Sequence, residues 1–276
     1  MDFSRHITNT IEWFYFEDVT SGRERDASVL VLGDKETTAP FVTLLEPRVH
    51  QVSRRLDDST YDYVVIPVLT KKILRLFQGD VHTMLHALTE TWLKKGGRIL
   101  MGIENALDID RMASGDRKED VLYLRWSELA SLRATLREEQ PGARETLYYL
   151  TPELNVPLHF YSDARMPDVS EEDEKTALLI RENRFREFVP AYFYIYQPDG
   201  SVRPKARDYR RFLPDYIKYN STRKPAYAIK TLLYRDDQGK RFAVKAGTTP
   251  EANAHIESLS EKAEAIAAAN PQLTVL

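Results

Sequence analysis

The sequence predicts an α/β sandwich in which helices cover both faces of a mostly parallel sheet. Three apolar runs, at 28–33, 61–69 and 98–103, predict buried strands, because strands covered on both faces carry continuous Val, Ile and Leu. Residues 81–93 have apolar positions at helical spacing, and we expect the Gly96-Gly97 pair to stop this helix. Strand, helix and strand in this order make a right-handed crossover, so we expect the three strands to pair in parallel.

Other segments add elements to both sides of this unit. Residues 3–19 form an aromatic amphipathic lead-in, and 48–53 predict a further strand. A helix is predicted from residue 127, with Ser127 as its N-cap and leucines at 129, 132 and 136.

The second half of the chain has the residue pattern of antiparallel rather than parallel strands. Residues 144–152 and 186–198 are aromatic, alternating and bounded by proline, which is typical of antiparallel strands. Between them, 167–183 predict a helix with an acidic first turn. The tail predicts two strands around a polar turn within 226–247, followed by a helix from about Thr249.

The basic, proline-containing stretch 199–214 is the predicted domain boundary. We therefore divide the chain into a main domain, 1–205, and a linker with a small appendage, 206–276, which could also be the start of a truncated domain. The last helix carries a thin apolar stripe of Ile256, Leu259 and Ile266. This stripe indicates a missing continuation of the chain or a contact in a homo-oligomer.

Composition excludes several classes of protein. Lys and Arg number 39 against 42 Asp and Glu, so no global positive field draws the chain to nucleic acid. There is no cysteine, hence no disulfide, thiolate metal site or cysteine nucleophile. No apolar stretch approaches the ~20 residues needed to cross a bilayer. We expect a cytoplasmic protein without direct membrane insertion.

In serial order, these segments resemble the class I S-adenosylmethionine-dependent methyltransferase fold, which is Rossmann-like. The resemblance is carried by "VLVLG" (29–33) as first strand, "YDYVVIPVL" (61–69) as fourth strand, and "LKKGGRILMGIEN" (93–105) as the passage into the fifth. More narrowly, the chain is similar over roughly residues 10–200 to a bacterial subfamily found in large cell-surface polysaccharide biosynthesis proteins. That similarity lies in "ILMGIENALDIDRMASG", "LRWSELASL", "LYYLTPELNVPLHFYSDARMP" and "NRFREFVPAYFY".

The resemblance implies S-adenosylmethionine as cofactor, bound at the carboxyl ends of the parallel strands. The positions that it assigns to cofactor binding are Gly33, Asp34, Lys35, Ser53, Pro67 and Leu69. It also implies a glycan precursor or another polysaccharide biosynthesis protein as partner.

The chain departs from this pattern at the residues that matter for the cofactor. No second or third glycine follows Gly33, and Ser53 stands where an acidic residue should accept bonds from the ribose hydroxyls. Residues 56–60 leave no room for the usual helix and third strand, a unit of about 30 residues. Asp57 or Asp58 could replace the lost acid. We expect Lys35, Glu36, Arg54 and Arg55 to narrow the cleft.

Four other groups have a structural and a functional interpretation. His82, His86 and Glu90 have helical spacing suited to a metal, but we expect no metal site. Glu104-Asn105 could contact a ligand, or Asn105 could cap the next segment. The tyrosines around 148 and 194 favour core packing over sugar stacking. The basic run 203–211 favours a solvated linker over phosphate binding.

Two functions stay open from the sequence. An active domain would transfer a methyl group from S-adenosylmethionine to a hydroxyl or phosphate of a glycan or its precursor, which requires alignment and at most one general base. No catalytic residue can be named. The alternative is a pseudoenzyme, an inactive scaffold or interaction domain that no longer binds the cofactor.

Overall fold

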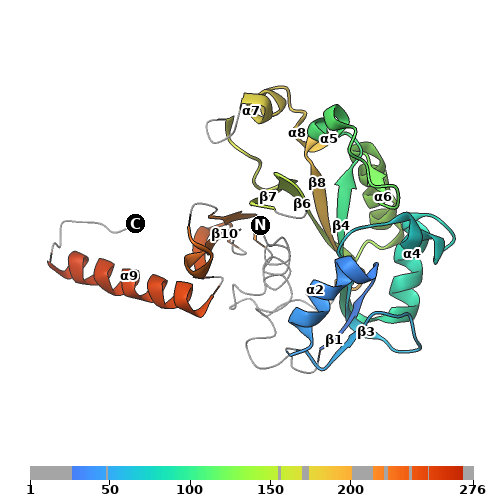
Figure 1. The fold of residues 1–276 in the computed structure, drawn as a ribbon, viewed down its shortest axis with the longest axis horizontal. Helices are drawn as coiled ribbons and strands as arrows, with labels where there is room; N and C mark the ends of the chain where they lie inside the picture. The colour runs from blue at the N-terminus through green and yellow to red at the C-terminus, as the bar shows by residue number, and fades with distance from the viewer. Residues whose placement is uncertain are drawn as a thin grey trace.

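The computed structural model describes residues 27–47, 49–154, 157–169, 174–200, 214–220, 223–235, 238–247 and 249–269. These residues form one mixed sheet of eleven strands with helices packed on its faces (Figure 1). The strands are β1 (Ser28–Val31), β2 (Gln51–Ser53), β3 (Tyr61–Ile66), β4 (Leu93–Asn105), β5 (Tyr123–Leu124), β6 (Arg144–Thr151), β7 (His159–Ser162), β8 (Ala191–Gln197), β9 (Tyr216–Tyr219), β10 (Ile229–Arg235) and β11 (Arg241–Gly247). The helices are α2 (Lys35–Leu45), α3 (Lys71–Arg75), α4 (Val81–Ala87), α5 (Ile109–Ser114), α6 (Trp126–Glu139), α7 (Glu174–Arg181), α8 (Phe185–Phe188) and α9 (Pro250–Ala269), with a π-turn η2 (Leu88–Trp92) and a 3-10 turn η5 (Pro225–Tyr227).

The first part of the sheet is parallel, as predicted. In the order β2-β1-β3-β4 all neighbours run in the same direction, with Val29 opposite Tyr63 and Val64 opposite Ile99. The central residues of β1 and β3 are fully buried, which is why these strands carry continuous apolar runs. The connection from β2 to β3, residues 54–60, contains no helix, in agreement with the missing unit.

The rest of the sheet is antiparallel, so the expectation of a mostly parallel sheet is wrong. Beyond β4 the order continues β8-β6-β7-β9-β10-β11, and every one of these neighbours runs in opposite directions. The cause lies in the connections: β6 to β7 and β10 to β11 are short links that reverse the chain, whereas a parallel pair needs a long crossover.

Helices cover both faces of the sheet (Figure 1). α2 packs Phe41, Val42 and Leu45 into one core, and α4 and α6 pack into the core on the opposite face. The aromatic cluster is core, as expected: each of its members is at most 5% exposed, namely Tyr148, Tyr149, Tyr192, Phe193, Tyr194 and Tyr196.

Two predicted helix ends are wrong. Ser127 is not the N-cap of α6, because the helix begins at Trp126 and the Glu128 carboxylate accepts a bond of 2.6 Å from the amide of Arg125. The Gly96-Gly97 pair does not stop a helix but lies inside β4, which already pairs with β3 at Leu93. The lead-in at 3–19 and the basic run 203–211, with most of the predicted boundary 199–214, lie outside the described residues.

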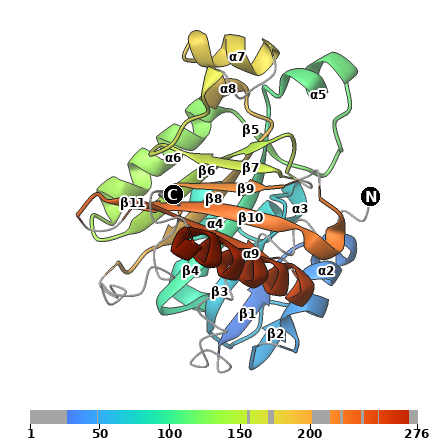
Figure 2. The ribbon, with the colours of Figure 1, turned by 90° about the vertical axis from the view of Figure 1, so that its left-hand side faces the viewer.

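The predicted C-terminal hairpin and helix are confirmed as β10, β11 and α9. The hairpin continues the main sheet, because β9 pairs with β7 and β10 pairs with β9. The division into 1–205 and 206–276 stays a prediction. α9 begins against β11 and extends away from the sheet in Figure 1, and Figure 2 draws it in front of the sheet, from the side on which it projects.

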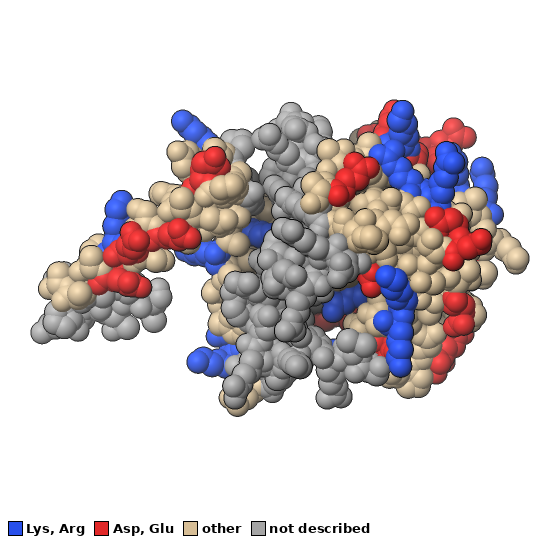
Figure 3. All heavy atoms as spheres, turned by 90° about the horizontal axis from the view of Figure 1, so that it is seen from below, with Lys and Arg blue, Asp and Glu red and all other residues tan. Residues whose placement is uncertain are grey.

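Charge is mixed over the described surface. In Figure 3, Asp and Glu side chains follow the projecting α9, whereas both signs intermingle at the opposite end of the molecule. Among the helices of the described residues, none combines the length and apolar character needed to cross a membrane.

Candidate functional site

The predicted cofactor positions come together at one edge of the sheet. Gly33 follows β1, Ser53 ends β2, and Pro67 follows β3, and these three strands pair in parallel. This is the edge at which open α/β sheets bind ligands. Which of the positions contacts a cofactor stays a prediction, but their surroundings can be compared with what S-adenosylmethionine requires.

The turn after β1 is short and closed by its own side chain. α2 begins at Lys35, so that only Leu32, Gly33 and Asp34 connect strand and helix. The Asp34 carboxylate accepts a bond of 2.8 Å from the amide of Thr37. A helix N-terminus attracts anions through its unpaired amides and dipole. In this chain the Asp34 carboxylate already provides the negative charge at the start of α2.

Gly33 is required for packing of this turn. A Cβ atom at Gly33 would lie 3.0 Å from the side chains of both Thr37 and Thr38, tighter than ordinary van der Waals contact. The hydroxyl of Thr38 also donates to the Asp34 carbonyl at 2.7 Å. The glycine therefore accommodates the start of α2, which is a sufficient reason for its presence.

Ser53 is engaged in a local turn. Its hydroxyl donates to the carbonyl of Arg55 at 2.9 Å and accepts from the amide of the same residue at 3.2 Å. Arg54 and Arg55 are exposed beside it. This end of β2 thus offers donors, whereas the ribose hydroxyls need an acceptor.

The acid that could replace Ser53 is also engaged. One carboxylate oxygen of Asp57 accepts from the Tyr61 hydroxyl at 2.7 Å and from the Ser59 amide at 2.9 Å. The hydrogen bond from Tyr61 is the main reason why the pKa of Asp57 is lowered. Asp57 therefore orders the connection between β2 and β3.

Pro67 and Leu69 are held against β4. Gly102 lets the Pro67 carbonyl approach closely, because a Cβ atom there would overlap it. The Leu69 amide then donates to the Gly102 carbonyl at 2.9 Å, and the Leu69 side chain is fully buried. A fully buried side chain cannot line a ligand site. The described residues at this edge do not fit S-adenosylmethionine: the turn is closed, Ser53 and Asp57 are engaged in local bonds, and Leu69 is core.

Glu104 and Asn105, at the end of β4, have structural partners. Glu104 accepts from Arg111 at 2.8 Å. Asn105 accepts from the Leu107 amide at 3.0 Å, as expected for a local cap, and donates to the carbonyls of Glu187 and Val189. Burial raises the pKa of Glu104, while Arg111 opposes the rise. These groups join α5 and α8 to the strand.

A cavity of about 460 Å³ lies further along the same edge. It is formed by α7, α8, the start of α5 and the adjoining ends of β6 and β7. Lys175 and Asp110 form an ion pair beside it, and Phe185 and Phe188 contribute its apolar part. His159 also lines it and hydrogen-bonds the Tyr216 hydroxyl at 2.8 Å. The cavity can hold a small ligand of mixed polarity. It could not be predicted from the sequence, because its residues come from five separate segments.

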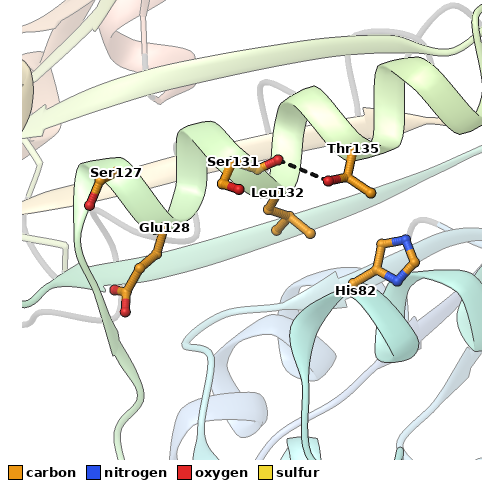
Figure 4. A pocket seen from close by; sticks show the side chains of 6 residues that line it. All are labelled: His82, Ser127, Glu128, Ser131, Leu132 and Thr135. Atoms are coloured by element: carbon orange, nitrogen blue, oxygen red, sulfur yellow. Dashed lines mark hydrogen bonds between the residues drawn. The ribbon is translucent and has the colours of Figure 1, made fainter.

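His82 faces a second hollow, of about 400 Å³, between α4 and α6. Figure 4 shows Ser127, Ser131 and Thr135 along one side of α6 with His82 opposite them. His82 pairs with Glu139 at 2.7 Å. Within the described residues, no three metal-ligating side chains gather at any point.

A buried cluster of charged and polar side chains joins α6 to β6 and β8. Buried Arg133 forms a forked pair with Glu145 at 3.1 and 3.2 Å, and the Tyr194 hydroxyl donates to the same carboxylate at 2.7 Å. Burial raises the pKa of Tyr194 far above its usual value. Nothing in the spacing of these residues predicts the cluster.

No protein-family model and no curated protein matches the chain. Distant structural similarity is found to S-adenosylmethionine-dependent methyltransferases. One from Archaeoglobus fulgidus has 14% identity and a TM-score of 0.37, covering 68% of this chain and 94% of that one. A "possible histamine N-methyltransferase" from Thermotoga maritima has 12% identity and a TM-score of 0.33, covering 70% and 90%. The YcgJ protein of Bacillus subtilis has 11% identity and a TM-score of 0.32, covering 69% and 97%. At this distance the similarity carries no argument about this chain, and the conclusions below rest on its own residues.

Proposed function

We propose that this chain is a non-catalytic interaction domain with a methyltransferase-like α/β fold that no longer binds S-adenosylmethionine. The observation that carries the proposal is the closed turn between β1 and α2, where Asp34 caps the helix at Thr37. The methionine end of S-adenosylmethionine carries a carboxylate of its own. At the start of α2 this group would compete with the Asp34 carboxylate, which already binds the Thr37 amide.

Two further features support the proposal. Ser53 stands at the position expected to accept from the ribose, with Arg54 and Arg55 exposed beside it, and Leu69 is fully buried in the core. Opening the edge to a ligand would separate Leu69 from Gly102 and expose the leucine to water, at a cost of about 2 kcal/mol for the side chain alone. The scaffold is therefore stabilised in the closed arrangement.

The second candidate is methyl transfer to a glycan or its precursor. The cavity beside His159 and Lys175 favours it, because this cavity opens at the edge of the sheet where an acceptor would meet a cofactor. In either case the partner that we propose is a surface glycan, or a protein that builds one, on the ground of the resemblance carried by the sequence segments quoted above.

Calorimetric titration with S-adenosylmethionine and S-adenosylhomocysteine separates the two functions. We expect dissociation constants weaker than ~1 mM, equivalent to about 4 kcal/mol or less. A methyltransferase of known affinity, titrated from the same stock, controls for ligand quality. Micromolar binding by this chain would contradict the proposal and restore the enzyme.

A further inference from the structure

A hollow beside the edge strand β11, at the other end of the strand order from β2, is lined by three arginines. It has a volume of about 260 Å³ and lies between the β10–β11 hairpin and the segments that follow β7 and precede β9. Arg165, Arg235 and Arg241 line it, with Asp215 as the one carboxylate among the lining residues. We propose that this hollow binds the phosphate group of a small organic phosphate.

The charges around the hollow are not balanced. Arg235 and Asp215 form an ion pair at 3.4 Å. Arg165 and Arg241 have no carboxylate partner among the residues that the structure describes, and the Nε atom of Arg165 is buried without a hydrogen-bond partner. Two arginines thus line one small space without a carboxylate partner among the described residues.

The strand register adds an independent observation. Arg235 and Arg241 are directly opposite each other in the β10–β11 ladder. Like charges at such positions destabilise a sheet, and Asp215 can compensate only part of this repulsion. An anion placed between the two side chains would remove the rest.

Arg165 is held in place for this role. Its guanidinium carbon lies 5.6 Å from the centre of the Tyr216 ring, a distance at which a cation and an aromatic face attract. A restrained guanidinium loses less conformational entropy on binding than a free one. Planar guanidinium groups bind phosphate oxygens through paired hydrogen bonds.

The neighbouring residues indicate the size and nature of the ligand. Leu233 and Ala243 are also cross-strand partners, one pleat from the arginine pair and on the same face. They give the hollow an apolar part beside its charged part. Its volume suits a phosphate with a small carbon skeleton, such as a sugar monophosphate, and excludes a dinucleotide.

Titration of the full chain with inorganic phosphate and with glucose 1-phosphate tests the proposal. We expect saturable binding of both in the millimolar range or tighter, weakening as salt is raised, and no binding of glucose. Arg241→Gln and Arg165→Gln should each weaken binding at least tenfold. Arg75→Gln, which changes an exposed arginine of α3 far from the hollow, should leave binding unchanged within twofold.

Melting curves establish that each variant is folded. If Arg165→Gln unfolds the protein, Arg165→Lys keeps the charge and should still weaken binding through loss of the planar fork. The proposal is contradicted if no saturable binding occurs up to 10 mM, if the variants of Arg165 and Arg241 bind as the parent does, or if Arg75→Gln weakens binding as much as they do.

Discussion

The ion pair of Glu104 and Arg111 is the residue-scale feature with the clearest dependence on pH. The two side chains are only 9% and 16% exposed. Burial raises the pKa of Glu104 despite the opposing effect of Arg111. A carboxyl group whose pKa is higher in the folded than in the unfolded chain makes folding less favourable as pH rises from the unfolded towards the folded value.

Replacing Arg111 by Ala should raise the pKa of Glu104 further and leave a buried charge without a partner. We expect Arg111→Ala to lower the free energy of unfolding by about 3 kcal/mol at pH 8, and by less at pH 5, where more of Glu104 is protonated. The double variant Glu104→Gln with Arg111→Ala should recover part of the loss at pH 8. Urea unfolding at both pH values measures this, and equal losses at the two values would contradict it.

Asp34 should contribute to stability as a helix cap. Asp34→Ala removes the bond to the Thr37 amide and should lower the free energy of unfolding by about 1 kcal/mol. Asp58→Ala, which removes an exposed aspartate, is the matched control and should change it by less than about 0.5 kcal/mol. If the two variants are equally stable, Asp34 does not close the turn.

Sequence reasoning was informative about side chains with local partners and uninformative about those with distant ones. The cap made by Asn105 on Leu107 was foreseen, but its bonds to Glu187 and Val189 cross more than 80 positions of the chain. The same holds for Arg133 and Glu145, whose helix and strand each look ordinary alone. Spacing along the chain carries no information about such pairs.

At the scale of elements, the packing of β3 against β4 depends on Gly102. A Cβ atom at this position would meet the Pro67 carbonyl, which is backbone and cannot turn aside. We expect Gly102→Ala to lower the free energy of unfolding by about 2 kcal/mol. Gly142→Ala is the control, because a Cβ atom there has no neighbour within 4 Å. Denaturant unfolding of the two variants measures this difference in stability. Equal free energies of unfolding would show that the close contact between Gly102 and Pro67 is not needed for packing.

The projecting helix α9 carries a coiled-coil spacing. Ile256, Leu259, Ala263 and Ile266 alternate at intervals of three and four, and Leu259 and Ile266 are 44% and 54% exposed. We propose that a second copy of the chain covers this stripe. Sedimentation equilibrium should show a dimer that Leu259→Glu with Ile266→Glu converts to monomer, while Ala268→Glu, off the stripe, leaves it intact. A monomeric parent protein would contradict the proposal.

The direction of several strands was predictable from the sequence, but the order of the strands in the sheet was not. β3 and β4 are joined by α4 and η2, and this crossover correctly predicted a parallel pair. The aromatic alternation of β6 and β8 predicted antiparallel strands, but their neighbours could not be foreseen. β8 pairs with both β4 and β6, and the sequence of a single strand does not indicate which strands it pairs with.

At the scale of the molecule, the C-terminal strands share the core of the main domain. Ile217 of β9 and Leu232 of β10 are fully buried in the same cluster as Val29 and Phe160. The tail therefore contributes to the stability of strands that precede it by more than 50 residues. Without β9, the edge of β7 and part of this core would be open to water.

Cutting the chain near residue 205 tests how independent the two parts are. We expect a chain cleaved at an introduced protease site to stay associated and to melt in one cooperative transition, because β9 remains paired with β7 at Phe160 and Ile217. Residues 206–276 expressed alone should not fold, since a hairpin and a helix bury too little surface. Residues 1–205 alone should be less stable than the full chain. Gel filtration of the cleaved chain and melting curves of both fragments measure these outcomes. If the fragments separate and 1–205 melts at the same temperature as the full chain, the two parts are independent units.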